Sequence, residues 1–135
     1  MAFEQLFTLE DALALLPRLR NLLQVLMAAM EEFSAKGNEY KALDDSKAHG
    51  NGYEVKREGL TSRLAELRRS IDENIEAINQ IGCQVKDLNL GLVDFPARRA
   101  NGEIVNLCWR MGEETIEYWH TLDTGFMSRR PLSEF

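Results

Sequence analysis

Hydrophobic residues in the first third of the chain recur at alternating steps of four and three positions. Thr8 followed by Asp11 matches a capping box, which places the start of a helix at Thr8. Gly37 and Asn38 interrupt the pattern, so we expect a helix over residues 8–36. The spacing is typical of a coiled-coil seam. The seam positions are Ala12, Leu16, Leu19, Leu23, Leu26, Met30 and Phe33, with a second stripe of Leu15, Leu22 and Ala29 beside them.

A second helical pattern follows a polar, glycine-containing stretch. We expect residues 37–53 to form a mobile loop and residues 54–82 to form a helix that closes at Gly82. Asn74 stands at the strict heptad position of this helix, where it can fix the register of a seam. The alternative, which we favour, is a shift of the seam to Ile75. The hydrophobic positions are Leu60, Leu64, Leu67, Ile71, Ile75 and Ile78.

The last third of the chain changes to the alternating pattern and the turn residues of β-structure. Asn101-Gly102 and Gly112-Glu113 predict tight turns between strands. A tail over residues 121–135 follows the last predicted strand. The expected strands lie within residues 83–120, at 83–86, 91–96, 104–110 and 115–120.

These elements predict an α+β fold in a single domain, residues 1–135. The helices form a long, coiled-coil-like antiparallel hairpin, and a small antiparallel meander of three to four strands follows them. A two-residue turn at Gly112-Glu113 would pair Val105 with His120. Because side chains alternate between the faces of a strand, this register places Cys108 and His120 on opposite faces of the sheet.

The composition is that of a soluble globular protein. The chain has 135 residues and a mass of 15.4 kDa, and 44% of its residues are hydrophobic and 28% charged. The net charge of −6 disfavours binding to nucleic acid. The only cysteines, Cys83 and Cys108, form no disulfide framework. No apolar run approaches the roughly 18 residues of a membrane helix, so we expect a cytoplasmic protein without membrane association.

Two kinds of small-ligand site compete in the last third of the chain. A divalent-metal site would use His120 and Cys108 together with Asp94 or Asp123, since imidazole, thiolate and carboxylate suit a transition metal. The predicted opposition of Cys108 and His120 argues against it. The same opposition argues against a nucleophile and base pair formed by these two residues. No cofactor is therefore predicted, and a metal remains the less favoured alternative.

The other site would bind a small anion or a carboxylate. Guanidinium groups clamp anions and stack on aromatic rings. The alternative is that the arginines pair with Glu113, Glu117, Asp94 or Asp123 and hold the tail on the sheet. The residues of the predicted anion site are Arg110, Arg129, Arg130, Trp119 and Asp94.

The preferred function at this stage is a non-enzymatic module for protein interaction or assembly. The helices carry more apolar surface than a small sheet can cover, which favours a homo-oligomer and in particular a dimer. The alternative function is the binding of a ligand, or catalysis, at the anion or metal site described above. The residues expected to pack helices or subunits together are Leu15, Leu16, Leu19, Leu22, Leu23, Leu26 and Met30.

Several strings of the sequence also occur together in a known family. The chain contains GLVDFP at 91–96, LCWRMGE at 107–113, IEYWH at 116–120 and GFMSRRPL at 125–132. Together with FTLEDALALLPRL at 7–19, this pattern resembles an uncharacterised family of small prokaryotic proteins, catalogued as a domain of unknown function. The resemblance implies one intact domain and carries no activity, substrate or catalytic residue.

Overall fold

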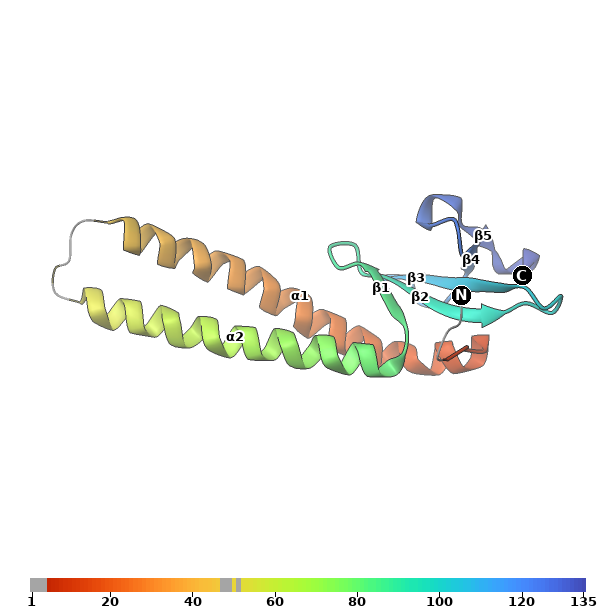
Figure 1. Ribbon diagram of the computed structural model, residues 1–135, viewed down its shortest axis with the longest axis horizontal. Helices are drawn as coiled ribbons and strands as arrows, with labels where there is room; N and C mark the ends of the chain where they lie inside the picture. Colours follow the sequence, from red (N-terminus) through yellow and green to blue (C-terminus); the bar gives the residue numbers. More distant parts are fainter. Residues whose placement is uncertain (1–4, 47–49, 51) are drawn as a thin grey trace. The chain divides into compact units, whose positions relative to one another are not determined.

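The structure, a computed structural model, describes residues 5–46, 50 and 52–135. Two long helices, α1 (Leu9–Asp45) and α2 (Tyr53–Ile81), pack together and precede a five-stranded antiparallel sheet (Figure 1). The expected α+β class is confirmed. The chain divides into two compact units, one formed by Met1–Leu23 with Ala77–Phe135 and the other by Gln24–Glu76. We call the first the sheet unit and the second the hairpin unit.

The start of α1 follows the sequence prediction. The Asp11 backbone N–H donates to Thr8 Oγ1 at 3.0 Å, and the Thr8 backbone N–H donates to Asp11 Oδ2 at 3.4 Å. These two bonds are the reciprocal pair of a capping box, and they satisfy amide groups that have no partner within the helix. The helix therefore begins where a purely local signal places it.

The end of α1 differs from the prediction, because the helix continues through Gly37 and Asn38 to Asp45. Residues 37–45 of the predicted loop are thus helical, whereas residues 47–49 and 51 lie outside the described residues. A glycine inside a helix costs about 1 kcal/mol relative to alanine. Packing against α2 offsets this cost, since Tyr40 beyond the glycine is half-buried and its interaction with Arg57 of α2 raises the pKa of that guanidinium.

The buried side of α2 keeps a strict heptad spacing to its end. Asn74 is half-buried, and its side-chain amide donates to the Ser70 carbonyl at 2.7 Å within the same helix. Ile75 is 37% exposed, whereas Ile78 is buried. The favoured prediction of a seam shifted to Ile75 is therefore wrong, because Asn74 satisfies its amide locally and does not have to leave the seam.

The sheet strands run in sequence order across the sheet. They are β1 (Gln84–Asp87), β2 (Leu92–Arg98), β3 (Ile104–Arg110), β4 (Tyr118–Thr121) and β5 (Arg130–Pro131), with short 3-10 turns at Phe126–Ser128 and Leu132–Glu134. The Asn101-Gly102 turn between β2 and β3 is confirmed, and Gly102 has the positive φ of 91° that such a turn requires. The strand expected at 115–120 begins only at Tyr118, and the tail supplies β5, a strand that the sequence did not predict.

The N-terminal part of the chain contacts one face of the sheet. The Phe7 and Phe95 rings meet edge to face at 5.3 Å between centroids, and the Phe7 N–H donates to the Pro96 carbonyl at 2.7 Å. The Arg20 guanidinium of α1 lies 5.7 Å from the centre of the Trp109 ring. Strand alternation gives this face its large buried side chains: Val93, Phe95, Val105, Leu107, Trp109 and Trp119.

α1 is long and apolar enough, by length and composition alone, to cross a membrane, with a mean hydropathy of 1.2 over its most apolar window. The expectation that no run approaches membrane length is therefore too strong. The criterion is weak evidence, because a core helix and a signal sequence meet it equally. Leu16, Leu19 and Leu23 are buried within the sheet unit, and 28% of the apolar window of α1 is buried.

The corrected end of α1 predicts the effect of replacing Gly37. Its φ is not positive, and an added Cβ would have no neighbour within 4 Å. Gly37→Ala should therefore raise the free energy of unfolding by about 1 kcal/mol, measured by urea denaturation.

Gly82→Ala is the matched control for this substitution. Gly82 has a φ of 94°, and its added Cβ would lie 2.9 Å from Gln5 Oε1, so this variant should be less stable than the wild type. A Gly37→Ala protein that is also destabilised would mean that residue 37 is not helical.

Candidate functional site

One face of the sheet carries a cluster of buried polar side chains. Asp94 of β2 pairs with Cys108 of β3, and Asn106 of β3 pairs with His120 of β4. Since alternate residues share a face, all four side chains lie on the side of the sheet opposite Phe95 and Leu107. Each residue is at most 4% exposed. We call Asp94, Cys108 and His120 the Asp–Cys–His cluster.

The cluster is compact and hydrogen-bonded. His120 Nε2 lies 3.0 Å from Asp94 Oδ1, and His120 Nδ1 lies 2.8 Å from the carbonyl oxygen of Thr121. One donor atom from each of Asp94, Cys108 and His120 lies within 4.8 Å of the other two. Carboxylate, thiol and imidazole therefore meet at one point beneath the surface.

The partners of His120 determine its charge. A backbone carbonyl and a carboxylate both accept hydrogen bonds, so the ring satisfies both contacts only when both of its nitrogens carry a proton. The hydrogen bond with Asp94 raises the pKa of His120 to about 10, with a smaller contribution in the same direction from Cys108, while burial acts in the opposite direction. At neutral pH the pair is a buried imidazolium and carboxylate.

The sequence-based register of β4 is wrong. Val105 pairs with Thr121 and not with His120, and the one-residue shift moves His120 to the face of Cys108. Cys108 and His120 therefore do not lie on opposite faces, and the objection to a site that uses both of them no longer holds. The predicted tight turn does form, since the Glu113 N–H donates to the Arg110 carbonyl at 2.9 Å and Gly112 has a φ of 104°. The register shifts because the chain continues as a loop through residues 114–117 before β4 begins.

Glu113 holds this loop in place. Its carboxylate accepts the Arg110 backbone N–H at 2.7 Å and Arg129 Nη2 at 2.8 Å. Its backbone carbonyl accepts Trp109 Nε1 at 2.9 Å and Arg20 Nη2 at 3.2 Å. One residue therefore receives donors from β3, α1 and the tail, and these contacts keep the loop long.

The residues of the predicted anion site lie on both faces of the sheet. Trp119 points to the face opposite Asp94 and Cys108, and the Arg130 guanidinium lies 5.3 Å from the centre of its ring. Arg110 is exposed and lies 5.8 Å from the ring of Phe126. Asp94 faces His120 and belongs to the buried cluster.

Arg129 has the most contacts among these arginines. Its guanidinium pairs with Glu113, lies 4.0 Å from the centre of the Tyr118 ring and donates to the Cys108 carbonyl at 3.3 Å. Its Nε is buried and has no hydrogen-bond partner among the described residues. This arrangement agrees with the alternative prediction, in which an arginine holds the tail on the sheet.

Asp123 lies outside the cluster. Its carboxylate accepts the Thr121 hydroxyl at 2.7 Å, which lowers its pKa, and its side chain is at the surface. Sequence reasoning did not single out Asn106 or the Thr121 carbonyl. Strand alternation predicts that the Asn106 side chain lies on the same face as Cys108. The contact of His120 with the Thr121 backbone carbonyl could not be predicted, because it involves no side chain of Thr121.

The geometry separates the chemical roles that the cluster could have. A cysteine nucleophile needs a neighbouring base with a free nitrogen, but both ring nitrogens of His120 already face acceptors. The side chains of Asp94 and His120 are each only 3% exposed. The arrangement suits a tightly held pair or an enclosed ion better than a site for a substrate.

The chain is thus a small α+β protein with a helical hairpin, an antiparallel sheet and buried aspartate, cysteine and histidine on one sheet face. The chain belongs to the family described as an uncharacterized conserved protein (DUF2203), whose model matches residues 5–132. This confirms the resemblance to a family of unknown function. No curated protein and no solved structure matches the chain.

The raised pKa of His120 predicts a pH-dependent stability. The folded protein retains the imidazolium proton to higher pH than the unfolded chain, where the ordinary pKa is 6.5. The stabilisation by the pair is thus complete below about pH 6.5 and is lost as the pH rises through about 10. In urea unfolding in metal-free buffer, the free-energy difference between wild type and Asp94→Asn should shrink from pH 6 to pH 10.

The matched control replaces the carboxylate of an exposed pair. Asp72 pairs with Arg68 at 3.4 Å, and both side chains are more than 60% exposed. Asp72→Asn should cost little and should differ from wild type by a constant amount over this pH range. A constant difference for Asp94→Asn would contradict the assignment of a charged pair.

Proposed function

We propose that the protein is a non-enzymatic assembly module that forms a homodimer through its hairpin unit. The observation that supports this is how little of that unit is buried. Two packed helices each bury only a stripe, and they leave the flanks of that stripe in contact with water. Among the described residues of the unit, the buried nonpolar side chains are Leu26, Ala29, Leu60 and Leu67.

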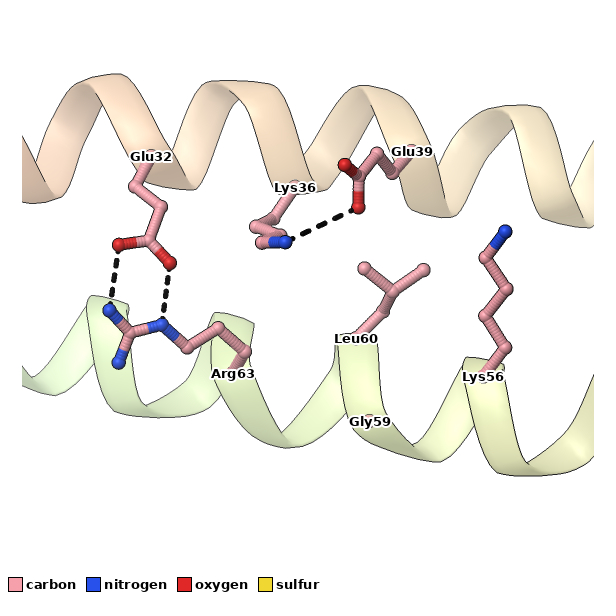
Figure 2. Close-up of a pocket in the computed structure, with 7 residues that line it drawn as sticks. All are labelled: Glu32, Lys36, Glu39, Lys56, Gly59, Leu60 and Arg63. Atoms are coloured by element: carbon pink, nitrogen blue, oxygen red, sulfur yellow. Dashed lines mark hydrogen bonds and ion pairs between the residues drawn. The ribbon is translucent and has the colours of Figure 1, made fainter.

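The hairpin unit also carries a groove along one side. Two hollows, of ≈460 and ≈310 Å³, share Glu32 and Arg63 in their walls and so follow one another along the helices. Figure 2 shows Leu60 directed from α2 toward α1, beside the ion pair of Glu32 and Arg63. Ala28 and Gly59 widen the groove because they lack bulky side chains, and Val25 at its edge is 50% exposed.

The charges of the groove favour a second copy of the chain as its occupant. The walls carry acidic and basic side chains in equal number, so two copies of this surface can face each other across a twofold axis without an excess of like charge. Lys56 forms no ion pair with the other residues drawn around the groove and can meet a carboxylate of the partner (Figure 2). The charged wall residues are Glu32, Glu39 and Glu66 together with Lys36, Lys56 and Arg63.

A pair of hairpins would complete a familiar architecture. Four helices from two copies enclose a core that two helices leave open, as in four-helix bundles. The heptad spacing within the chain supports coiled-coil packing of this kind. In α2 the residues at this heptad spacing are Leu60, Leu64, Leu67, Ile71, Asn74 and Ile78.

The residues first expected at a subunit contact divide into two groups. Leu16, Leu19, Leu23 and Leu26 are buried within the chain and serve its own packing. Leu15, Leu22 and Met30 are half-buried. The proposed contact therefore uses the groove and not the primary seam of α1.

The two cysteines are free and buried, which supports the proposal of a cytoplasmic, reducing environment.

The dimer can be tested by filling the groove. A Cβ added at Gly59 would meet no atom within 4 Å, and its φ is not positive. Because Gly59 lines the groove, we expect the helix to accept a tryptophan there and its ring to fill the groove. Wild type should sediment at twice the 15.4 kDa chain mass at tens of micromolar. Gly59→Trp should raise the dimer dissociation constant at least tenfold, about 1.4 kcal/mol.

Ala65→Trp is the matched control. Ala65 is exposed on α2, and the helical period places it opposite Leu60 and Leu67. This variant should remain dimeric, and both variants should keep the wild-type helix content by circular dichroism. A folded wild type that sediments as a monomer at these concentrations would overturn the proposal.

A further inference from the structure

We propose that the Asp–Cys–His cluster binds one divalent transition-metal ion of the zinc type. The proposal is independent of assembly through the hairpin unit. Its basis is geometric, because three different ligand types from three adjacent strands bring their donor atoms within 4.8 Å of one another. The residues are at most 2% exposed, so the site is enclosed.

The donor set selects the class of metal. Thiolate and imidazole prefer zinc and its neighbours in the first transition series, whereas magnesium and calcium prefer all-oxygen sites. Zinc bonds to these donors have lengths of about 2.0–2.3 Å, so donors around one zinc ion lie roughly 3.5 Å apart. His120 Nε2 and Asp94 Oδ1 already lie 3.0 Å apart, and no two of the three donor atoms are more than 4.8 Å apart. Small side-chain rotations, of about 1 Å at the donor atoms, therefore suffice to place all three around one ion.

The contact on the far side of His120 orients the ring as metal sites require. Histidine ligands almost always donate their second ring N–H to a carbonyl or carboxylate, which fixes the tautomer. His120 Nδ1 lies 2.8 Å from the Thr121 carbonyl, so Nε2 is the nitrogen directed toward Asp94. An imidazole held this way is ready to coordinate through Nε2.

Asn106 provides a second, independent indication of a missing ligand. Asn106 is 4% exposed, and its Oδ1 has no hydrogen-bond partner among the described residues. Such a buried oxygen destabilises the folded protein unless a donor or a cation meets it. Asn106 pairs directly with His120 on the cluster face, so a metal, or a water bound to it, can satisfy this oxygen.

The charge balance also permits a buried dication. Without metal, the Asp94 carboxylate, the His120 imidazolium and the Cys108 thiol sum to zero. Metal binding releases the thiol proton and the Nε2 proton to solvent, and the dication, carboxylate, thiolate and neutral imidazole again sum to zero. The enclosed site therefore takes up the ion without acquiring net charge, which avoids the large penalty of burying an uncompensated charge.

Cobalt provides the direct test, because a cobalt–thiolate bond has a characteristic charge-transfer absorption. Purified protein is stripped with a chelator and titrated with Co²⁺ and then with Zn²⁺. One equivalent of Co²⁺ should produce the thiolate band, and one equivalent of Zn²⁺ should displace it. Cys108→Ser should abolish the band and weaken zinc binding at least 100-fold.

Cys83→Ser is the matched control and assigns the thiol even if the Cys108 variant fails to fold. Cys83 is also free and buried, but its Sγ contacts the Ile78 carbonyl at 3.9 Å, and burial raises the pKa of its thiol to about 11. Cys108 is then the only thiol in the chain. The band should persist in this variant, and its loss would overturn the assignment.

Asn106 is tested in the same titration. Asn106→Ala should weaken zinc binding about 10- to 100-fold, the usual effect of losing a supporting group. Asn79→Ala, at an exposed position of α2, should leave it unchanged. Wild-type protein that is folded by circular dichroism yet takes up neither Co²⁺ nor Zn²⁺ at neutral pH would refute the site.

Discussion

The contacts of Glu113 determine how the second half of the sheet is built. Its carboxylate and its carbonyl together accept hydrogen bonds from a strand, from α1 and from the tail. Charged partners strengthen two of these bonds. Because Glu113 lies between β3 and β4, its position sets the length of the loop and hence the residue at which β4 begins. A shorter loop would turn every side chain of β4 to the other face.

This register also determines which side chains of β4 are buried on each face of the sheet. It brings His120 to Asp94 and Cys108, and it directs Trp119 to the face that Phe95 and Leu107 also line. A buried ion pair is seldom worth more than a nonpolar replacement of the same shape. Its presence in the small core therefore argues for a role other than stability, and the unpartnered oxygen of Asn106 points to the same place.

The parts of the fold that the sequence could predict depend on neighbouring residues alone. The capping box of Thr8, the glycine at the end of α2 and the Asn101-Gly102 turn are local signals, and the structure contains each of them. The predictions from the sequence were wrong where contacts between residues far apart in the chain outweigh these local signals. Packing against α2 carries α1 past Gly37. The tight turn at Gly112 forms, but Glu113 is held by Arg20 and Arg129 and the chain does not enter β4 directly after it. The candidate metal ligands could be named from the sequence. Their meeting at one point could not be predicted, because it depends on the register between β3 and β4.

The two outer strands of the sheet limit how the protein can associate. β1 has a register irregularity between Val85 and Asp87 and carries the exposed Lys86, while β5 has only two residues, one of them Pro131. Irregular or very short edges, lysine and proline all hinder the addition of a strand from another chain. Both edges of the sheet therefore disfavour the addition of a strand from another molecule. This agrees with the proposal that copies of the chain meet through the helices and leaves the enclosed polar face away from any such pairing.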